Sequence, residues 1–239
     1  MLNYRVDPAL LEPYVPRGTT LDTWQGTAYV SLVGFLFRHT RVLGVPIPLH
    51  RDFEEVNLRF YVRREVNGDV RRGVTFIREI VPRAAIAVVA RLAYNEPYIA
   101  LPMRHEIGAQ HNADAAPSTI RYEWRQGAAW SALAVEASGT ATAIASGSEA
   151  EFITEHYWGY TRQRDGGTVE YHVTHPRWRT WKVTGAAVHG DLAELYGAKF
   201  GEVVRRAPDS AFLAEGSSIA VHMPARLSPM LSTRRVSRS

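Results

Sequence analysis

The clearest pattern in the chain is an alternation of apolar and polar residues between Phe53 and Arg63, with the apolar residues at even positions. A period of two predicts a β-strand with one packed face and one polar face. Asn67-Gly68 follows, and both residue types tolerate positive φ. The chain is therefore expected to turn there into an antiparallel strand near Gly73–Ile80.

Other segments predict further strands and turns. Gln25-Gly26 interrupts a β-branched and aromatic run, which predicts a hairpin with its second strand over Thr27–Phe37. Asp165-Gly166-Gly167 predicts the turn of another hairpin, over Tyr160–Thr174. Single strands are expected at Leu101–Ile107, Thr119–Arg125, Trp130–Ala137 and Ser217–His222.

Three short helices are expected, at Ala84–Ala93, Ser148–Tyr157 and Asp191–Phe200. Ser148 and Glu151 have the spacing of a capping box, which marks the start of the second helix. Because strands greatly outnumber helices, the sequence predicts a mainly β (α+β) fold, an antiparallel sheet or barrel with the helices packed outside.

The domain organisation is expected to be simple, with one domain over residues 1–227. Residues 228–239 contain three arginines and no acidic residue, and are expected to form a disordered basic tail. Removing these three charges from the formal +4 leaves +1, which is too little to bind nucleic acid. Prolines make 41–52 irregular, and this loop could be a lid or a plain rim.

The composition narrows the chemistry. The absence of cysteine excludes disulfides, thiolate nucleophiles and thiolate metal sites. No segment has the apolar length of a signal peptide or a membrane helix, so a cytoplasmic protein without membrane contact is expected. Phosphate-loop and Gly-x-Ser-x-Gly motifs are missing. His172 and His175 would point to opposite faces of a strand, so neither a metal nor a cofactor is expected.

Lysine is scarce, with only Lys182 and Lys199 in the chain. An amine nucleophile needs a pKa lowered by burial or by a nearby cation. Lys182 lies among arginines and tryptophans that could lower its pKa, although a solvated strand lysine fits the same pattern. Lys199 is expected at the surface.

The polar face of the 53–63 strand is the first candidate site. If the strand lines a barrel, Asn57, Arg59 and Tyr61 converge on one cavity at spacings of about 7 Å. Arg59 could then hold a substrate carboxylate through two parallel hydrogen bonds. A solvent-exposed polar face gives the same alternation, and this alternative stays open.

Four segments resemble, in order and spacing, the YqjF-like family of unknown function: residues 55–63, 90–98, 151–157 and 175–178. The resemblance covers about Tyr4 to Leu227. That family is similar in fold to acetoacetate decarboxylase, which implies a cone-shaped antiparallel β-barrel with short flanking helices. The resemblance also implies a buried pocket into which Asn57, Arg59 and Tyr61 face.

The resemblance breaks down at the catalytic lysine. In the decarboxylase a Pro-Lys-Lys segment carries the Schiff-base lysine, whereas here Tyr98 and Ile99 follow Pro97. Imine chemistry is therefore not expected. Acid and base chemistry is left to three candidates, Glu96, Glu155 and His175. The candidates for substrate binding are Asn57, Arg59, Tyr61, Arg91, Tyr98 and Trp178.

Two functions remain. The first is a small-molecule-binding barrel that acts as a lyase-type enzyme on a keto acid or related anionic carbonyl compound. The second is a non-catalytic ligand-binding or interaction protein with a vestigial pocket. They differ in whether the site's carboxylates are desolvated and available or locked into ion pairs. The only partner expected is a small anionic molecule, and whether the chain forms a homo-oligomer is left open.

Overall fold

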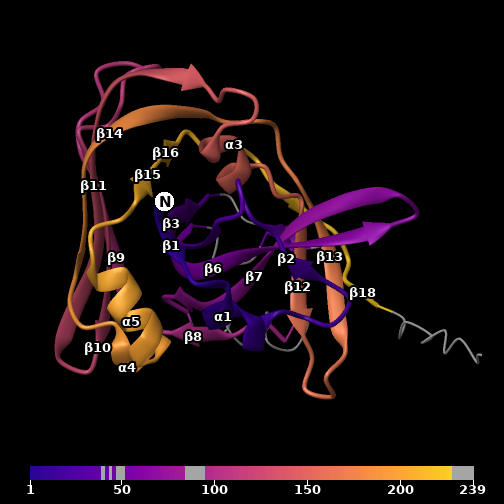
Figure 1. Cartoon of the computed structure of the whole chain (residues 1–239). Coiled ribbons are helices and arrows are strands. Elements are labelled where there is room, and N and C mark those ends of the chain that lie inside the picture. Colours follow the sequence, from indigo (N-terminus) through magenta and orange to yellow (C-terminus); the bar gives the residue numbers. More distant parts are fainter. Residues whose placement is uncertain (39–40, 43–44, 47–51, 84–94, 228–239) are drawn as a thin grey trace, which may run out of the picture.

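The computed structural model describes residues 1–38, 41–42, 45–46, 52–83 and 95–227 (Figure 1). The strands form two large sheets and one two-stranded pair, β4 (Arg41–Val42) with β5 (Val45–Pro46). The larger sheet contains β1 (Leu2–Val6), β2 (Thr20–Leu21), β3 (Ala28–Phe37), β6 (Phe53–Val66), β7 (Asp69–Val81), β8 (Tyr98–Ala100), β12 (Trp158–Arg162), β13 (Thr168–Thr174), β15 (Ser210–Ala211), β17 (Ala220–Val221) and β18 (Ala225–Arg226).

The smaller sheet arches over one side of the larger one (Figure 1). It contains β9 (Met103–Ile107), β10 (Thr119–Gln126), β11 (Ala129–Ala143), β14 (Arg179–His189) and β16 (Leu213–Ala214). The helices are short: α1 (Pro8–Leu11), the 3-10 helix η1 (Glu12–Tyr14), α3 (Glu149–Thr154), α4 (Ala193–Tyr196) and α5 (Ala198–Arg205). No helix among these described residues is long and apolar enough to cross a membrane.

The mainly β class is confirmed, but the closed barrel is not. Among the described strands, neither large sheet is hydrogen-bonded into a ring. Most neighbours in this part of the chain are antiparallel, and the exceptions are β7 with β12 and β7 with β8, which are parallel. These two parallel neighbours bring distant parts of the chain beside β7.

Both faces of β6 are covered as far as Val62, and the last four residues of the strand are partly exposed. Its even-numbered residues, such as Leu58 and Phe60, pack into the core shared with Tyr122 and Trp124 of the smaller sheet. The opposite face is buried as well, because Asn57 and Tyr61 are each only 1% exposed. The interpretation of this face as a solvent-exposed polar surface is therefore wrong.

Several local predictions are confirmed. Asn67 and Gly68 turn the chain between β6 and β7 with φ of 53° and 89°. β12 and β13 form the expected hairpin, and Ser148 Oγ accepts a hydrogen bond from the Glu151 amide at 3.2 Å, which caps α3.

Other predictions need correction. The strand before Gln25-Gly26 makes only one bridge to its predicted partner, and β2 pairs instead with β6. α3 ends at Thr154 rather than near Tyr157, because Glu155 leaves the helical conformation. The helix expected over Asp191–Phe200 is split into α4 and α5 by Gly197, whose φ is 83°.

The remaining predictions lie outside the described residues. These are the helix over 84–93, most of the 41–52 loop and the tail over 228–239.

Candidate functional site

A row of polar side chains crosses three neighbouring strands of the larger sheet. In register, Asn57 on β6 faces Glu79 on β7, and Glu79 faces Tyr98 on β8. Glu55 lies two residues before Asn57 and so shares its face. The Asn57 side-chain amide donates to Glu55 Oε1 at 3.0 Å, and the Tyr98 hydroxyl donates to Glu55 Oε2 at 3.0 Å.

A β-bulge places Glu79 in this row. Starting from the turn at Asn67-Gly68, β6 and β7 pair regularly from Val66 with Asp69 to Arg59 with Phe76. The next pair is Leu58 with Arg78, so Ile77 is skipped. β7 thus has one extra residue, Ile77, at this point. With regular pairing Asn57 would face Arg78, because a register shift moves each partner by one residue. Because of the bulge, Asn57 faces the carboxyl group of Glu79 and not the guanidinium group of Arg78.

Glu96 joins the row from the segment just before β8. It is 4% exposed, and Asn95 before it has a positive φ of 56°. Its Oε1 accepts from the Tyr171 hydroxyl on β13 at 3.0 Å and also from the Thr161 hydroxyl on β12. Five separate segments thus supply this group: β6, β7, residues 96–98, β12 and β13.

We call Glu55, Glu79 and Glu96 the carboxylate cluster. Burial raises the pKa of Glu55 to about 7, even though hydrogen bonds from Asn57 and Tyr98 favour the ionised form. Burial likewise raises the pKa of Glu96 to about 7. Burial, followed by the charges of Glu96 and Glu55, raises the pKa of Glu79 well above its usual range.

These environments separate the three carboxyl groups into different roles near neutral pH. Burial and the charges of Glu96 and Glu55 raise the pKa of Glu79, which favours its protonated form, whereas Glu55 and Glu96 change protonation state around neutrality. A general acid or base works best when its pKa lies near the operating pH. Within the described part of the chain, no ion pair joins any of the three to a cation.

Gly159 on β12 makes room for one of the hydroxyl donors. It faces Tyr171 in register, and a Cβ atom there would lie 2.0 Å from Tyr171 Cζ. Real Cβ contacts are never so short, so a side chain at this position would displace the ring. The glycine therefore lets Tyr171 lie flat across the strand and reach Glu96.

Arg59 and Tyr61 continue the same face of β6 but contact other groups. Arg59 is half-buried and donates from Nη2 to the Ile153 carbonyl oxygen at 3.4 Å, while its Nε is buried without a partner. The Tyr61 hydroxyl lies 2.6 Å from Ser31 Oγ, and its ring packs on Phe152. Asn57, Arg59 and Tyr61 thus all lie inside, although only Asn57 contacts the carboxylate cluster.

A histidine that the sequence did not single out lies behind Tyr61. The His156 ring is 4.6 Å from the Tyr61 ring, centroid to centroid, and its Nε2 is 3.9 Å from Asp22 Oδ2. Burial lowers the pKa of His156 to about 4. His156 is therefore neutral at neutral pH and belongs to the packing around Tyr61.

The other predicted site residues form a separate group at the surface. The His175 ring stacks between Tyr157 and Trp178, with centroid distances of 4.8 and 4.3 Å. Glu155 accepts a hydrogen bond from the Tyr157 hydroxyl and lies 3.8 Å from Arg177 Nε. The structure thus brings Glu96, Asn57 and Tyr98 together and places Glu155, His175 and Trp178 in this second group.

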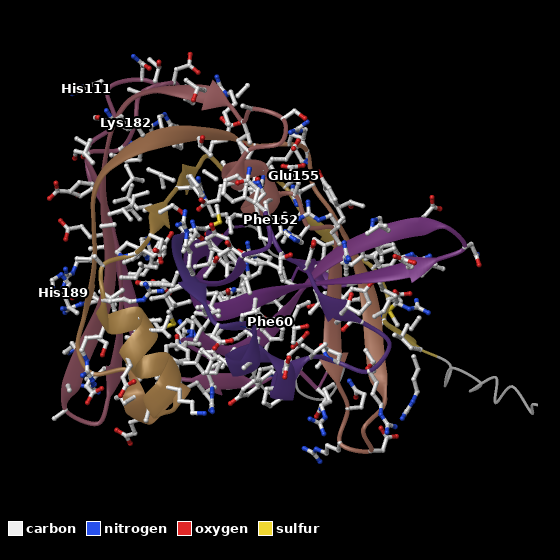
Figure 2. All side chains as sticks on the ribbon, viewed as in Figure 1. Phe60, His111, Phe152, Glu155, Lys182 and His189 are labelled. Atoms are coloured by element: carbon white, nitrogen blue, oxygen red, sulfur yellow. The ribbon has the colours of Figure 1, made fainter. Side chains whose placement is uncertain are left out.

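Neither lysine is part of a buried site. Lys182 is exposed on β14, and Figure 2 shows it at the outside of the arch, away from Phe60 and Phe152 in the interior. Lys199 is exposed on α5, as expected. Arg91 lies outside the described residues.

In the described ranges, no group of three or more His, Asp or Glu side chains could hold a metal ion.

A cavity of about 20 Å³ lies between the two sheets, which is room for about one water molecule. It is lined by Met1, Gly34, Ile120, Tyr122, Leu133, Val135 and Leu213.

Comparison with known proteins places this arrangement in context. Residues 1–218 match the model of DUF2071, a family described as uncharacterized conserved protein. Uncharacterized protein YqjF of Bacillus subtilis (strain 168) is 29% identical over 164 residues, covering 68% of this chain and 64% of YqjF. The match therefore spans somewhat less than two thirds of that relative.

Solved structures of other proteins have a similar fold at low sequence identity. Acetoacetate decarboxylase from Legionella pneumophila superposes with a TM-score of 0.61 and 13% identity, covering 97% of this chain and 84% of that one. The enduracididine biosynthesis enzyme MppR, solved with pyruvate, gives a TM-score of 0.61 and 14% identity over 95% and 86% of the two chains. The predicted resemblance in family and fold is thus confirmed.

Proposed function

Because the chain belongs to the DUF2071 family and its fold is similar to that of acetoacetate decarboxylase, we propose that it is an enzyme that moves a proton at a carbonyl compound. The observation that carries this proposal is the carboxylate cluster, three buried carboxyl groups without a paired cation among the described residues. Structural carboxylates buried in a core are usually paired, and unpaired ones with raised pKa values are typical of acid and base catalysis.

The roles follow from the raised pKa values of the three carboxyl groups. Glu79 protonates the carbonyl oxygen, while Glu55 or Glu96 removes a proton from the neighbouring carbon. Hydrogen bonds from Tyr98 to Glu55 and from Tyr171 to Glu96 hold the two bases in place. No imine takes part, because both lysines of the chain are exposed on the outside.

The substrate class is a keto acid or related anionic carbonyl compound. Arg59 supports this choice, since its Nε is buried without a partner beside the cluster and can donate to a substrate carboxylate. The similar MppR structure contains pyruvate, which is a keto acid. The rival function, a non-catalytic binding protein, is less well supported because the cluster is not locked into ion pairs within the described ranges.

The test is deuterium exchange followed by NMR. Levulinate and pyruvate are incubated with the protein in D₂O, and the protons next to the carbonyl are expected to exchange faster than in buffer. Glu79→Gln should slow the exchange by at least about a hundredfold, the typical contribution of a general acid or base. Glu202→Gln, at an exposed glutamate of α5, is the matched control.

Two results would contradict the proposal. Exchange no faster than in buffer for either compound would favour the rival function. Exchange that is equally fast in Glu79→Gln would remove the carboxylate cluster from the chemistry. Borohydride treatment with a keto acid should leave no covalent adduct on either lysine.

A further inference from the structure

The polar atoms around the carboxylate cluster are unevenly matched. The side chains of Asn57 and Tyr98 donate to Glu55, and those of Thr161 and Tyr171 donate to Glu96. These four donors bond both carboxyl oxygens of Glu55 and the Oε1 atom of Glu96.

Besides the donor Arg59 Nε, three side-chain oxygens around the cluster lack a partner, and a carboxyl oxygen accepts once its group is ionised. They are Asn57 Oδ1, Glu79 Oε2 and Glu96 Oε2, and their residues are 1%, 2% and 4% exposed. A buried polar atom without a partner destabilises the folded protein, and more so when it is charged. Asn57 is independent support for a ligand, because its amide is uncharged and is fixed by its bond to Glu55 with the oxygen left free.

From this imbalance we propose that the carboxylate cluster binds a primary ammonium group of the substrate. An ammonium group has three N–H donors and no acceptor, which equals the number of free oxygens. Its positive charge also supplies the counterion that the three glutamates lack among the described residues. A carboxylate at the same place would add a further negative charge to the cluster and leave every acceptor unpaired.

The position of Arg59 deepens the proposed function. Asn57 and Arg59 share one face of β6 and are two residues apart, which separates them by about 7 Å along the strand. A substrate with an ammonium group at the cluster and a carboxylate on Arg59 Nε would span this distance. The substrate class is therefore an amino-substituted keto acid, and this step rests on the proposed function.

The binding test uses three compounds of equal chain length that have no ketone. They are 4-aminobutanoate, 4-(trimethylammonio)butanoate and butanoate, titrated by calorimetry at constant ionic strength. The first has N–H donors, the second has the same charge without them, and the third has no cation. We expect 4-aminobutanoate to bind at least about tenfold more tightly than either of the others, the value of one good charged hydrogen bond.

Variants locate the binding. Asn57→Leu and Glu79→Gln should each weaken binding of 4-aminobutanoate at least about tenfold, whereas Glu202→Gln should leave it unchanged. Circular dichroism confirms that each variant is folded. Equal affinity for 4-aminobutanoate and the trimethylammonio compound, tighter binding of butanoate, or an undiminished affinity in Glu79→Gln would each overturn the ammonium site.

The two proposals fail separately. Tight binding of 4-aminobutanoate without any deuterium exchange would keep the ammonium site and refute the catalytic function. Exchange of levulinate that depends on Glu79, together with no binding of 4-aminobutanoate, would keep the function and refute the ammonium site.

Discussion

The raised pKa of Glu96 predicts an unusual dependence of stability on pH. Its pKa is about 7 in the folded protein against 4.5 for a glutamate in water, a rise of about 2.5. At about 1.4 kcal/mol per pKa unit, this carboxyl group lowers the free energy of unfolding by about 3 kcal/mol once both states are ionised. Glu96 is only 4% exposed, so solvent screens little of this cost.

The direction in which stability changes with pH follows from proton linkage between the folded and unfolded states. Because the folded pKa is the higher one, the folded state holds the proton more tightly than the unfolded state between the two values. The stabilisation is complete below about pH 4.5 and is lost as the pH rises through about 7. This is opposite to the behaviour of an ion-paired glutamate, which stabilises the protein as the pH rises.

Glu96→Gln isolates the effect. Glutamine stays neutral at every pH, and its oxygen can still accept from Tyr171 and Thr161. Urea unfolding of wild type and variant from pH 4.5 to 8.5 gives the difference in free energy of unfolding, in which the contributions of groups that do not interact with Glu96 cancel. We expect the variant to gain about 3 kcal/mol relative to wild type between the lowest and highest pH. A flat difference, or a relative loss for the variant at high pH, would refute the reasoning.

Two further predictions concern the packing around the cluster. His156 has a folded pKa of about 4 against 6.5, so this residue should contribute a loss of about 3 kcal/mol to the stability of the wild type as the pH falls from 6.5 to 4, against the opposite contribution of Glu96. His156→Phe should reduce this loss, as measured by unfolding at both pH values, and an unchanged acid loss would count against it. Gly159→Ala should displace Tyr171, cost about 1–3 kcal/mol of stability and slow deuterium exchange, while Gly127→Ala, where a Cβ meets no atom within 4 Å, should leave exchange unchanged.

The alternation in residues 53–63 is enough to predict β6 and the shared face of Asn57, Arg59 and Tyr61, because a strand's side-chain period is local. It cannot decide whether that face is buried, since burial depends on segments far away in the sequence. Glu96 and Tyr98 are found only through the resemblance to a family.

Glu79 could not be predicted because its position depends on register. Counting from the Asn67-Gly68 turn places Arg78 opposite Asn57, and nothing in the sequence marks the extra residue at Ile77. Thr161 and Tyr171 could not be predicted either. They lie near Glu96 because β12 pairs in parallel with β7 and β13 pairs with β12, and the sequence does not indicate this pairing.

The split of the last helix had a visible signal in Gly197, which can adopt the positive φ that ends α4. Asp191 is correctly placed, since its Oδ1 accepts from the Ala193 amide at 2.9 Å. The prediction is wrong about the end of the helix, since α5 runs to Arg205, and about its continuity, because a glycine inside a helical pattern is often tolerated without a break.

The extra residue at Ile77 has a consequence for the evolution of this family. Because Arg78 and Glu79 are adjacent in β7, the strand carries a basic and an acidic side chain, and the bulge decides which of them faces Asn57. A relative of equal length whose two strands paired without the bulge would present the guanidinium to Asn57 in place of the carboxyl group. The sign of the charge beside Asn57 is thus decided by strand register, without any substitution in β6 or β7.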